Sequence, residues 1–345
     1  MKRTENRFKN SRLFVFGAGA SYCATSSMGT EKRAPLDKEF CERLKTVSAQ
    51  RPLWVGESRD ELLRAWKDHL PFESFGLEQA IIRHLGHSEF KRAIHKRANL
   101  NMLSDGDYIN HLAHLICYIL RKAKEGSKAP YKSFVERIFD PAEDRIVTFN
   151  YDELLDQHLL DSHPRRSVYF DRIDISENGN RAEHHPHPLL VKLHGSVNWR
   201  CNKEDLTTIV EGVDGEDEFV VPSIWYSEKG TPSPQDDSSP LIIPPLPSKP
   251  ITQIKLFCFL WTKAYEYLHE AKELVICGYS LPDADQLAQS MFANFRNKEL
   301  RTVTIIDPNP TIMSKWRDLF RRKTINQSAR WQYFESFTEY VVSST

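Results

Sequence analysis

The chain has 345 residues, of which 40% are hydrophobic and 27% charged, enough for a substantial hydrophobic core. Its 47 basic and 47 acidic residues give a formal net charge of zero. This balance gives no electrostatic reason to expect direct nucleic-acid binding or an anionic membrane partner. The six cysteines form no C-x-x-C pair, which is typical of a reducing compartment. Because residues 1–10 are polar and no window reaches about 18 apolar residues, we expect a cytoplasmic protein.

In chain order, the first half begins with a strand and then becomes helical. The apolar run Leu13–Phe16 predicts a buried strand that ends at Gly17. Leu36–Val47 predicts a helix, because Phe40 and Leu44 fall on one face. The apolar spacing of 51–139 is helical throughout, so this region interrupts the strand pattern.

Strands return in the second half of the chain. They are expected at Arg145–Phe149, Val168–Phe170, Leu189–Leu193, Leu274–Cys277 and Val303–Ile306. Helices are expected at 251–272, 285–296 and 311–320. The segment 201–250 is different, since it is acidic and rich in Ser and Pro. We expect it to be irregular, with one strand suggested at Val220–Trp225 and an extended connector at Pro240–Pro250.

The alternation of strands and helices predicts an α/β fold with a Rossmann-like, mostly parallel sheet and a helical insertion. We assign 1–345 to a single domain. Its Rossmann-like core comprises 11–50, 140–200 and 251–335, its helical insertion is 51–139, and its Pro-rich irregular segment is 201–250. The apolar helices of the insertion are compatible with a core, a lid or an interface, and a core is the default interpretation.

Five predicted strands each end in small or polar residues. The clusters that follow them are Gly17–Ser21, Asn150–Asp152, His194–Ser196, Gly278–Ser280 and Asp307–Asn309. The carboxyl ends of parallel strands share one edge of a sheet, and ligands bind at that edge. We therefore expect these five clusters to converge on one crevice.

Each cluster alone also has an ordinary structural explanation. Gly17–Ser21 suits a phosphate cradle at a helix N-terminus, but it equally suits a tight turn. Asn150 and Asp152 are good helix caps. His194 could transfer protons near neutral pH, although a histidine at a strand end is more often structural. Ser280 could bind phosphate or cap a helix. The tract His184, His185 and His187 lacks a partnering Cys or carboxylate pattern, so we predict no metal site.

Taken in order, these clusters resemble motifs of the sirtuin superfamily. Gly17–Ser21 is similar to the family's glycine motif, and Thr148–Asp152 resembles its Thr-Gln-Asn-Ile-Asp segment. Leu193–Ser196 resembles the segment with the catalytic histidine, and Gly278–Ser280 resembles the Gly-Thr-Ser phosphate loop. The resemblance covers roughly 11–50, 140–200 and 270–310.

The departures from the family bear on the activity. Protein-deacylating sirtuins carry a zinc ribbon with two Cys pairs and a Gly-Ile-Pro-Asp-Phe-Arg loop, and this chain has neither. The pattern is closer to the sirtuin-like NAD hydrolases of bacterial anti-phage defence. That resemblance implies NAD as substrate, depletion of NAD on infection, and a homo-oligomer or a partner ATPase or Argonaute-like protein.

The resemblance also suggests roles for individual residues. His194 would be the general base, Asn150 would orient the nicotinamide amide or the attacking water, and Asp152 would tune the site or hold Asn150. Asp307 or Asn309 would bind the adenosine ribose. The residues expected to hold the diphosphate are Gly17, Ala18, Gly19, Ala20, Ser21, Gly278 and Ser280.

Three alternatives stay open from the sequence. The chain could be a non-catalytic sensor of NAD or ADP-ribose, although Asn150 and His194 argue against this. It could be a protein deacylase, which the missing zinc ribbon disfavours. It could also be an assembly or nucleic-acid adaptor whose helical region docks a partner, a role compatible with catalysis.

Overall fold

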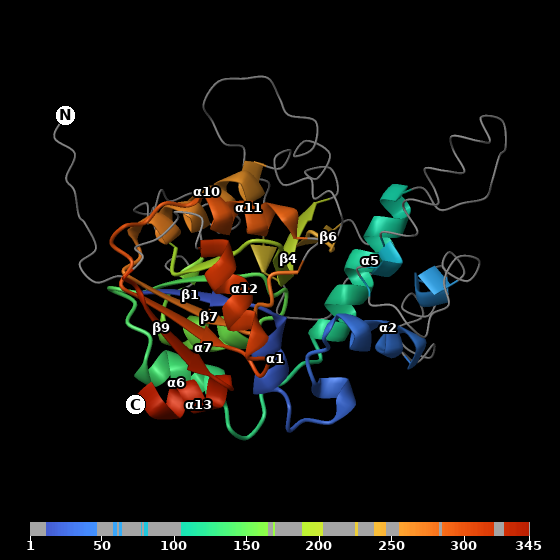
Figure 1. Ribbon diagram of the computed structural model, residues 1–345. Helices are drawn as coiled ribbons and strands as arrows, with labels where there is room; N and C mark the ends of the chain where they lie inside the picture. Colours follow the sequence, from blue (N-terminus) through green and yellow to red (C-terminus); the bar gives the residue numbers. More distant parts are fainter. Residues whose placement is uncertain are drawn as a thin grey trace.

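Figure 1 presents the computed structural model of the protein. The structure describes residues 12–46, 58–60, 62–63, 77, 79–81, 105–164, 168–169, 188–202, 225–226, 238–245, 255–282, 285–320 and 328–344.

A six-stranded parallel sheet forms the centre of the molecule, which confirms the predicted fold class. Its strands lie in the order β3-β2-β1-β7-β8-β9, and every neighbouring pair is parallel. The chain therefore proceeds outwards from β1 to one edge and then from β7 to the other, so the order reverses between β1 and β7. Such a switch point is where doubly wound sheets bind ligands. The strands are β1 (Arg12–Phe16), β2 (Arg145–Thr148), β3 (Leu190–Lys192), β7 (Glu273–Cys277), β8 (Thr302–Ile306) and β9 (Arg330–Phe334).

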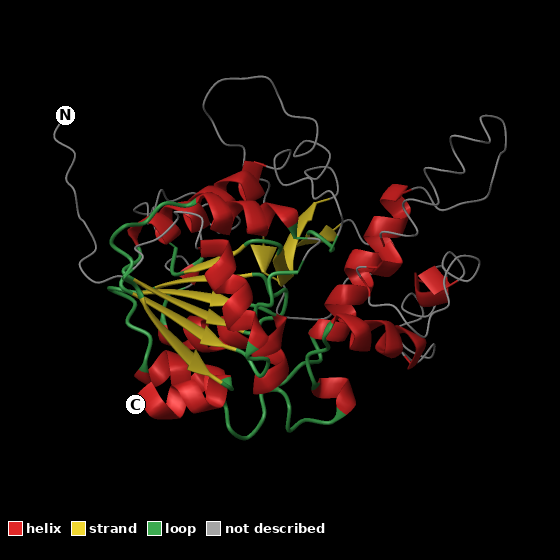
Figure 2. Ribbon diagram, in the orientation of Figure 1, coloured by secondary structure: helices red, strands yellow, loops and turns green. Residues whose placement is uncertain are grey.

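Helices cover both faces of this sheet, as Figures 1 and 2 show. One layer contains α10 (Lys255–Glu270), α11 (Gln286–Asn294) and α12 (Thr311–Phe320). The opposite layer contains α6 (Pro130–Arg137), α7 (Leu154–Ser162) and α13 (Phe337–Ser344). Two-sided burial explains why the central strands are apolar at successive positions rather than alternating.

The layer under β1 is an aromatic cluster. Phe16 makes edge contacts with Phe134 of α6 and Phe337 of α13, with ring centroids 5.4 and 5.5 Å apart. Tyr131 of α6 also makes edge contacts with Phe16 and Phe337. The α6 residues thus belong to the core of the sheet, although they fall within the range 51–139.

A second, antiparallel sheet follows directly from the first. β3 is followed by only Leu193 and His194 before β4 (Gly195–Asn202) begins. β4 pairs with β5 (Trp225–Tyr226) and β6 (Ser238–Ile242), in the order β5-β4-β6. The segment 201–250 thus contributes β strands, despite its prolines. Pro240 is tolerated because β6 lies at an edge of the sheet.

The helical region packs on this second sheet. α2 (Asp37–Thr46) and α5 (Asp105–Leu120) share a buried cluster that also includes Val197 of β4 and Ile242 of β6. Short helices at α1 (Ala18–Ala24) and η1 (Thr30–Lys32) connect β1 to α2. No helix in the described ranges combines the length and the apolar character needed to cross a bilayer.

The predicted strand at Val168–Phe170 is wrong. Val168 is helical, its amide donates to the carbonyl of Pro164, and both Val168 and Tyr169 are buried. A short apolar run predicts burial, but it does not distinguish a strand from a helical turn. Phe170 and residues 220–224 of the predicted strand Val220–Trp225 lie outside the described residues, and Trp225 is the first residue of β5. β9 and α13 have no counterpart among the predicted elements.

The loops after β1 and β7 interlock backbone against backbone at the switch point. The amide of Gly19 donates to the carbonyl of Gly278 at 2.9 Å, and the amide of Gly17 donates to Cys277. Gly278 has a φ of +61°, and a Cβ there would lie 2.1 Å from the amide nitrogen of Ala20. No other residue type fits this crossing without moving the loops.

Gly278→Ala should therefore lower the free energy of unfolding by about 2–4 kcal/mol, through left-handed strain and overlap with Ala20. Gly29→Ala is the matched control, because Gly29 has a φ of −60° and nothing lies within 4 Å of the added methyl group. Denaturant unfolding measures both variants. Equal stability of the two variants would contradict the interlocked-loop interpretation.

Candidate functional site

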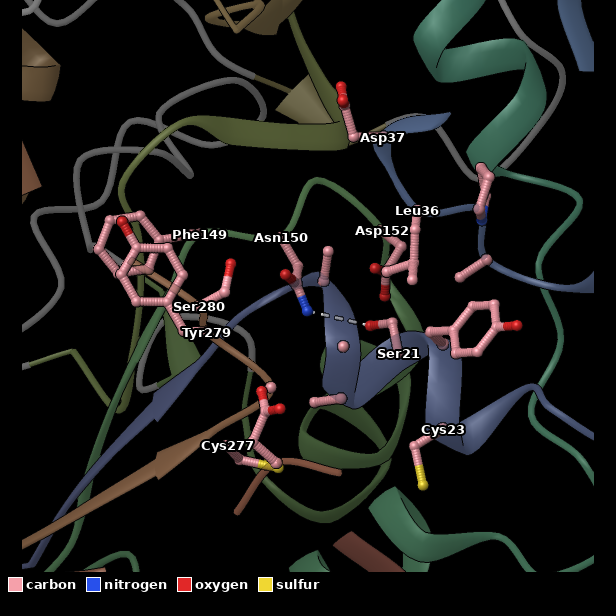
Figure 3. Close-up of a pocket in the computed structure, with 18 of the residues that line it drawn as sticks. Ser21, Cys23, Leu36, Asp37, Phe149, Asn150, Asp152, Cys277, Tyr279 and Ser280 are labelled. Atoms are coloured by element: carbon pink, nitrogen blue, oxygen red, sulfur yellow. Dashed lines mark hydrogen bonds between the residues drawn. The ribbon is translucent and has the colours of Figure 1, made fainter. Parts of the chain in front are cut away.

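A cavity of about 730 Å³ opens at the carboxyl edge of the parallel sheet (Figure 3). Loops after all six strands of the parallel sheet and side chains of α2 and α5 line it. A cavity of this size is typical of small-molecule and cofactor sites. It brings together ten of the predicted site residues: Ala18, Gly19, Ala20, Ser21, Asn150, Asp152, His194, Gly278, Ser280 and Asp307. Gly17 and Asn309 do not line it.

Asn150 is held by the β1–α1 turn. Its side-chain nitrogen donates to the Gly17 carbonyl and to the Ser21 hydroxyl, both at 3.0 Å. The dashed line in Figure 3 marks the contact with Ser21. The Gly17 carbonyl can only accept, so the orientation of the amide is determined and both of its hydrogens are used. Asn150 can therefore offer a ligand its Oδ1, as a hydrogen-bond acceptor.

Asp152 combines a structural contact with a place in the cavity wall. Its Oδ1 accepts from the amide of Leu154 at 3.2 Å, in the first turn of α7. Burial raises the pKa of its carboxyl, while the Lys192 ammonium and the Ser21 hydroxyl act to lower it. Asp152 thus contacts the first turn of α7 and also lines the cavity.

His194 lies in an aromatic cage at the junction of the two sheets. Phe149, Tyr151 and Trp261 surround its ring, with centroids 5.6 to 6.1 Å away. Its backbone carbonyl accepts from Ile243 at 2.9 Å, and the side chain is 6% exposed. The imidazole is thereby fixed in place at the cavity wall.

Asp285 is the acidic neighbour of His194. Its Oδ2 lies 3.8 Å from Nε2 of His194 and accepts from the Tyr279 hydroxyl at 3.0 Å. Tyr279 in turn stacks flat on Phe149, with centroids 3.9 Å apart and planes at 4°. Figure 3 shows this stack beside Ser280. A histidine paired with a buried carboxylate is a common general-base arrangement.

The expected phosphate cradle is partly used by the protein itself. The amide of Gly19 donates to Gly278, and the amide of Ala20 donates to Gly17. The Ser21 hydroxyl lies 3.0 Å from the Tyr131 hydroxyl, besides its bond from Asn150. Fewer donors of this turn are thus available to a diphosphate than the sequence pattern suggests. Ser280 is exposed.

The two residues expected at the adenosine ribose differ in their surroundings. Asp307 lines the cavity, and partial burial raises the pKa of its carboxyl. Its Oδ1 accepts from the amide of Asn309 at 2.9 Å. The Asn309 side chain accepts from the amide and hydroxyl of Thr311, so it caps α12. Of the pair, Asp307 is placed to contact a ligand.

Several cavity residues were not predicted from the sequence. Asp285 and Tyr279 lie in the β7–α11 loop, where only Gly278 and Ser280 were singled out. Ala34, Pro35, Leu36 and Asp37 also line the cavity, although their sequence lacks the sirtuin loop motif. The acid at 285, seven residues after Gly278, was the available signal, because it follows a strand end like the other clusters.

No cluster of three or more His, Cys, Asp or Glu side chains suited to a metal occurs among the residues that the structure describes. The histidines at 184, 185 and 187 lie outside those residues.

The raised pKa of Asp152 predicts a pH trend. A carboxyl whose folded pKa exceeds its unfolded value binds protons better in the folded state, so its ionisation destabilises the fold. As pH rises from 3.8 through the folded pKa, the Asp152→Asn variant should gain stability relative to the wild type. Thermal unfolding from pH 3 to 8 measures this difference, with exposed Asp161→Asn as control. A difference independent of pH would refute the prediction.

Comparisons with known proteins give the following similarities. Residues 144–230, which include Asn150, Asp152 and His194, match the family model described as a SIR2-like domain. A solved Sir2 homologue in complex with NAD is 10% identical, with a TM-score of 0.40 over 97% of this chain and 87% of that chain. A mutant Sir2 homologue in complex with ADP-ribose is 12% identical, with a TM-score of 0.39 over 97% and 90%. No curated protein sequence gives a match. The segment that carries three of the predicted catalytic residues is therefore similar to a SIR2-like domain.

Proposed function

We propose that the cavity binds NAD and that the protein hydrolyses the bond between nicotinamide and ribose. The observation that carries the proposal is the meeting of Asn150, His194 and Asp285 in the wall of one cavity, at the switch point of a doubly wound sheet. The SIR2-like match of 144–230 adds support, because it includes the first two of these residues.

The chemistry requires little acid catalysis. Nicotinamide carries the positive charge in NAD and leaves as a neutral base when its bond to the ribose C1′ breaks. Water adds to that carbon, and its proton is removed, so the products are nicotinamide, ADP-ribose and a proton. The protein has to position the water and stabilise the positive charge that develops on the ribose.

The residues of the wall suit these tasks. His194 takes a proton from the water or from a ribose hydroxyl, and the Asp285 carboxylate at 3.8 Å stabilises the resulting imidazolium. Asn150 Oδ1 accepts a hydrogen from the water or from the nicotinamide carboxamide. The aromatic cage around His194 limits access of bulk water to the reacting face.

The diphosphate lies near the interlocked loops of Gly17–Ser21 and Gly278–Ser280 in this proposal. Ser280 is exposed and has its hydroxyl available, whereas several amides of α1 are already bonded. Asp307 is at the end of β8, where it accepts from the adenosine ribose hydroxyls.

The cellular role that we propose is NAD depletion in anti-phage defence. The protein would act in the cytoplasm as a homo-oligomer or with a partner ATPase or Argonaute-like protein. The support for this role is the resemblance of its motifs to the sirtuin-like hydrolases of that class.

The principal test is NAD turnover by the purified protein, with released nicotinamide measured by chromatography. His194→Ala and Asn150→Ala should each lower turnover by at least about 100-fold, since general-base and positioning groups contribute rates of that order. His163→Ala, at the end of α7, is the matched control with unchanged turnover. If the wild type binds NAD without cleaving it, the protein is a sensor of NAD or ADP-ribose instead.

The pairing of His194 with Asp285 has its own test. Asp285→Asn should lower kcat by about tenfold or more and leave folding intact, because its side chain makes no capping bond on α11. In the His194→Ala background, the same substitution should have no further effect on kcat, because the two residues act together. Additive losses in the double variant would show that Asp285 acts independently of His194.

A further inference from the structure

A fully buried lysine lies beneath the Asn150–Asp152 turn. Lys192 of β3 donates from its ammonium to both carboxylate oxygens of Asp156, each at 2.9 Å, and to the backbone carbonyl of Asp152 at 2.6 Å. The side chains of Lys192 and Asp156 are 0% and 2% exposed. The Tyr169 hydroxyl also donates to Asp156. All three hydrogens of the ammonium are thus accounted for.

Stability alone does not explain this arrangement. A buried ion pair contributes little net stability compared with apolar residues of the same volume, because both charges lose their hydration. The geometry suggests another reason. Lys192 precedes His194 by two residues, and it holds the carbonyl of Asp152 in the turn that carries Asn150. The ammonium therefore connects the strand that leads to the base with the turn that holds the amide.

The charged and titratable groups around Asp152 come from three elements. Lys192 comes from β3, Asp156 from α7 and Tyr131 from α6. Burial raises the pKa of Tyr131 well above its ordinary value, so this hydroxyl stays neutral. Lys192 is therefore the cation that lowers the pKa of Asp152 against the effect of burial, while Asp156 raises that pKa.

We propose that Lys192 is a positioning residue of the site. With Asp156 as its counterion, it holds the Asn150–Asp152 turn in register with His194 and places its positive charge beside Asp152. Its effect on turnover rests on the proposed NAD hydrolysis, whereas its effect on Asp152 does not.

The test removes the buried pair as a unit. Lys192→Met and Asp156→Leu together eliminate both charges, so that neither is left buried alone, whereas each single change leaves one uncompensated charge. A neutral pair of similar shape, K192Q/D156N, serves if the first double variant does not fold. R12M/D144L is the matched control, because Arg12 and Asp144 form a 2.6 Å ion pair at the amino ends of β1 and β2, whereas the cavity lies at the carboxyl ends.

Three readouts are compared with the wild type: the melting temperature, kcat and KM for NAD across pH, and the titration of the Asp152 carboxyl by carbon-13 NMR. The Asp152→Asn variant assigns the NMR signal. In the double variant at Lys192 and Asp156, we expect the melting temperature to recover relative to the single variants. Asp152 should titrate at higher pH than in the wild type, because Lys192 lowers its pKa by more than Asp156 raises it, and both are removed together.

In the same double variant, kcat should fall by about 10- to 100-fold with little change in KM, because misplacing a reacting group by about 1 Å has an effect of that order. The acidic limb of its kcat–pH profile should move to higher pH. Wild-type kcat with an unmoved Asp152 titration would overturn the proposal. The control pair should change the melting temperature without moving that titration. If the wild type does not cleave NAD, the proposed hydrolysis fails, and the NMR titration still decides the role of Lys192.

Discussion

The contact between two glycine-rich loops is the constraint on which the rest of the site depends. Gly17 and Gly19 cross Gly278 at a distance that only backbone atoms can occupy. That crossing fixes the ends of β1 and β7, the two strands at which the sheet order reverses. Asn150 donates to the carbonyl of Gly17, and Tyr279 follows Gly278, so the positions of both side chains in the cavity wall depend on the same crossing. The glycines thus serve chain geometry at least as much as ligand binding.

The sequence was sufficient for five of the six strands of the parallel sheet, because buried parallel strands are continuous apolar runs that end in small or polar residues, whereas β9 was not predicted. Leu13–Phe16, Leu274–Cys277 and Val303–Ile306 were each predicted within one residue of the observed strands. The convergence of Ser21, Asn150, His194 and Asp307 on one cavity followed from the shared carboxyl edge of parallel strands. The predicted strand at Val168–Phe170 failed because burial of a short run does not specify its backbone.

Other parts of the site were beyond the reach of sequence patterns, since they depend on tertiary contacts between distant segments. Asp285 becomes the neighbour of His194 only when the β7–α11 loop folds back over Phe149. The use of the Gly19 amide by the protein itself depends on the position of Gly278, more than 250 residues away in the chain. Lys192 reads in the sequence as an interruption of an apolar strand, and only the packing of α7 against β3 reveals its acidic partner.

The junction of the two sheets has a mechanical consequence. Leu193 and His194 are the whole connection between β3, which belongs to the rigid parallel sheet, and β4, which carries the α2 and α5 cluster through Val197. If α2 and α5 rotate with β4 relative to the parallel sheet, the change in backbone direction along this stretch has to occur at Leu193 and His194. A displacement of α2 and α5 against the parallel sheet would therefore change the orientation of the His194 ring, which is the proton acceptor in the proposed reaction.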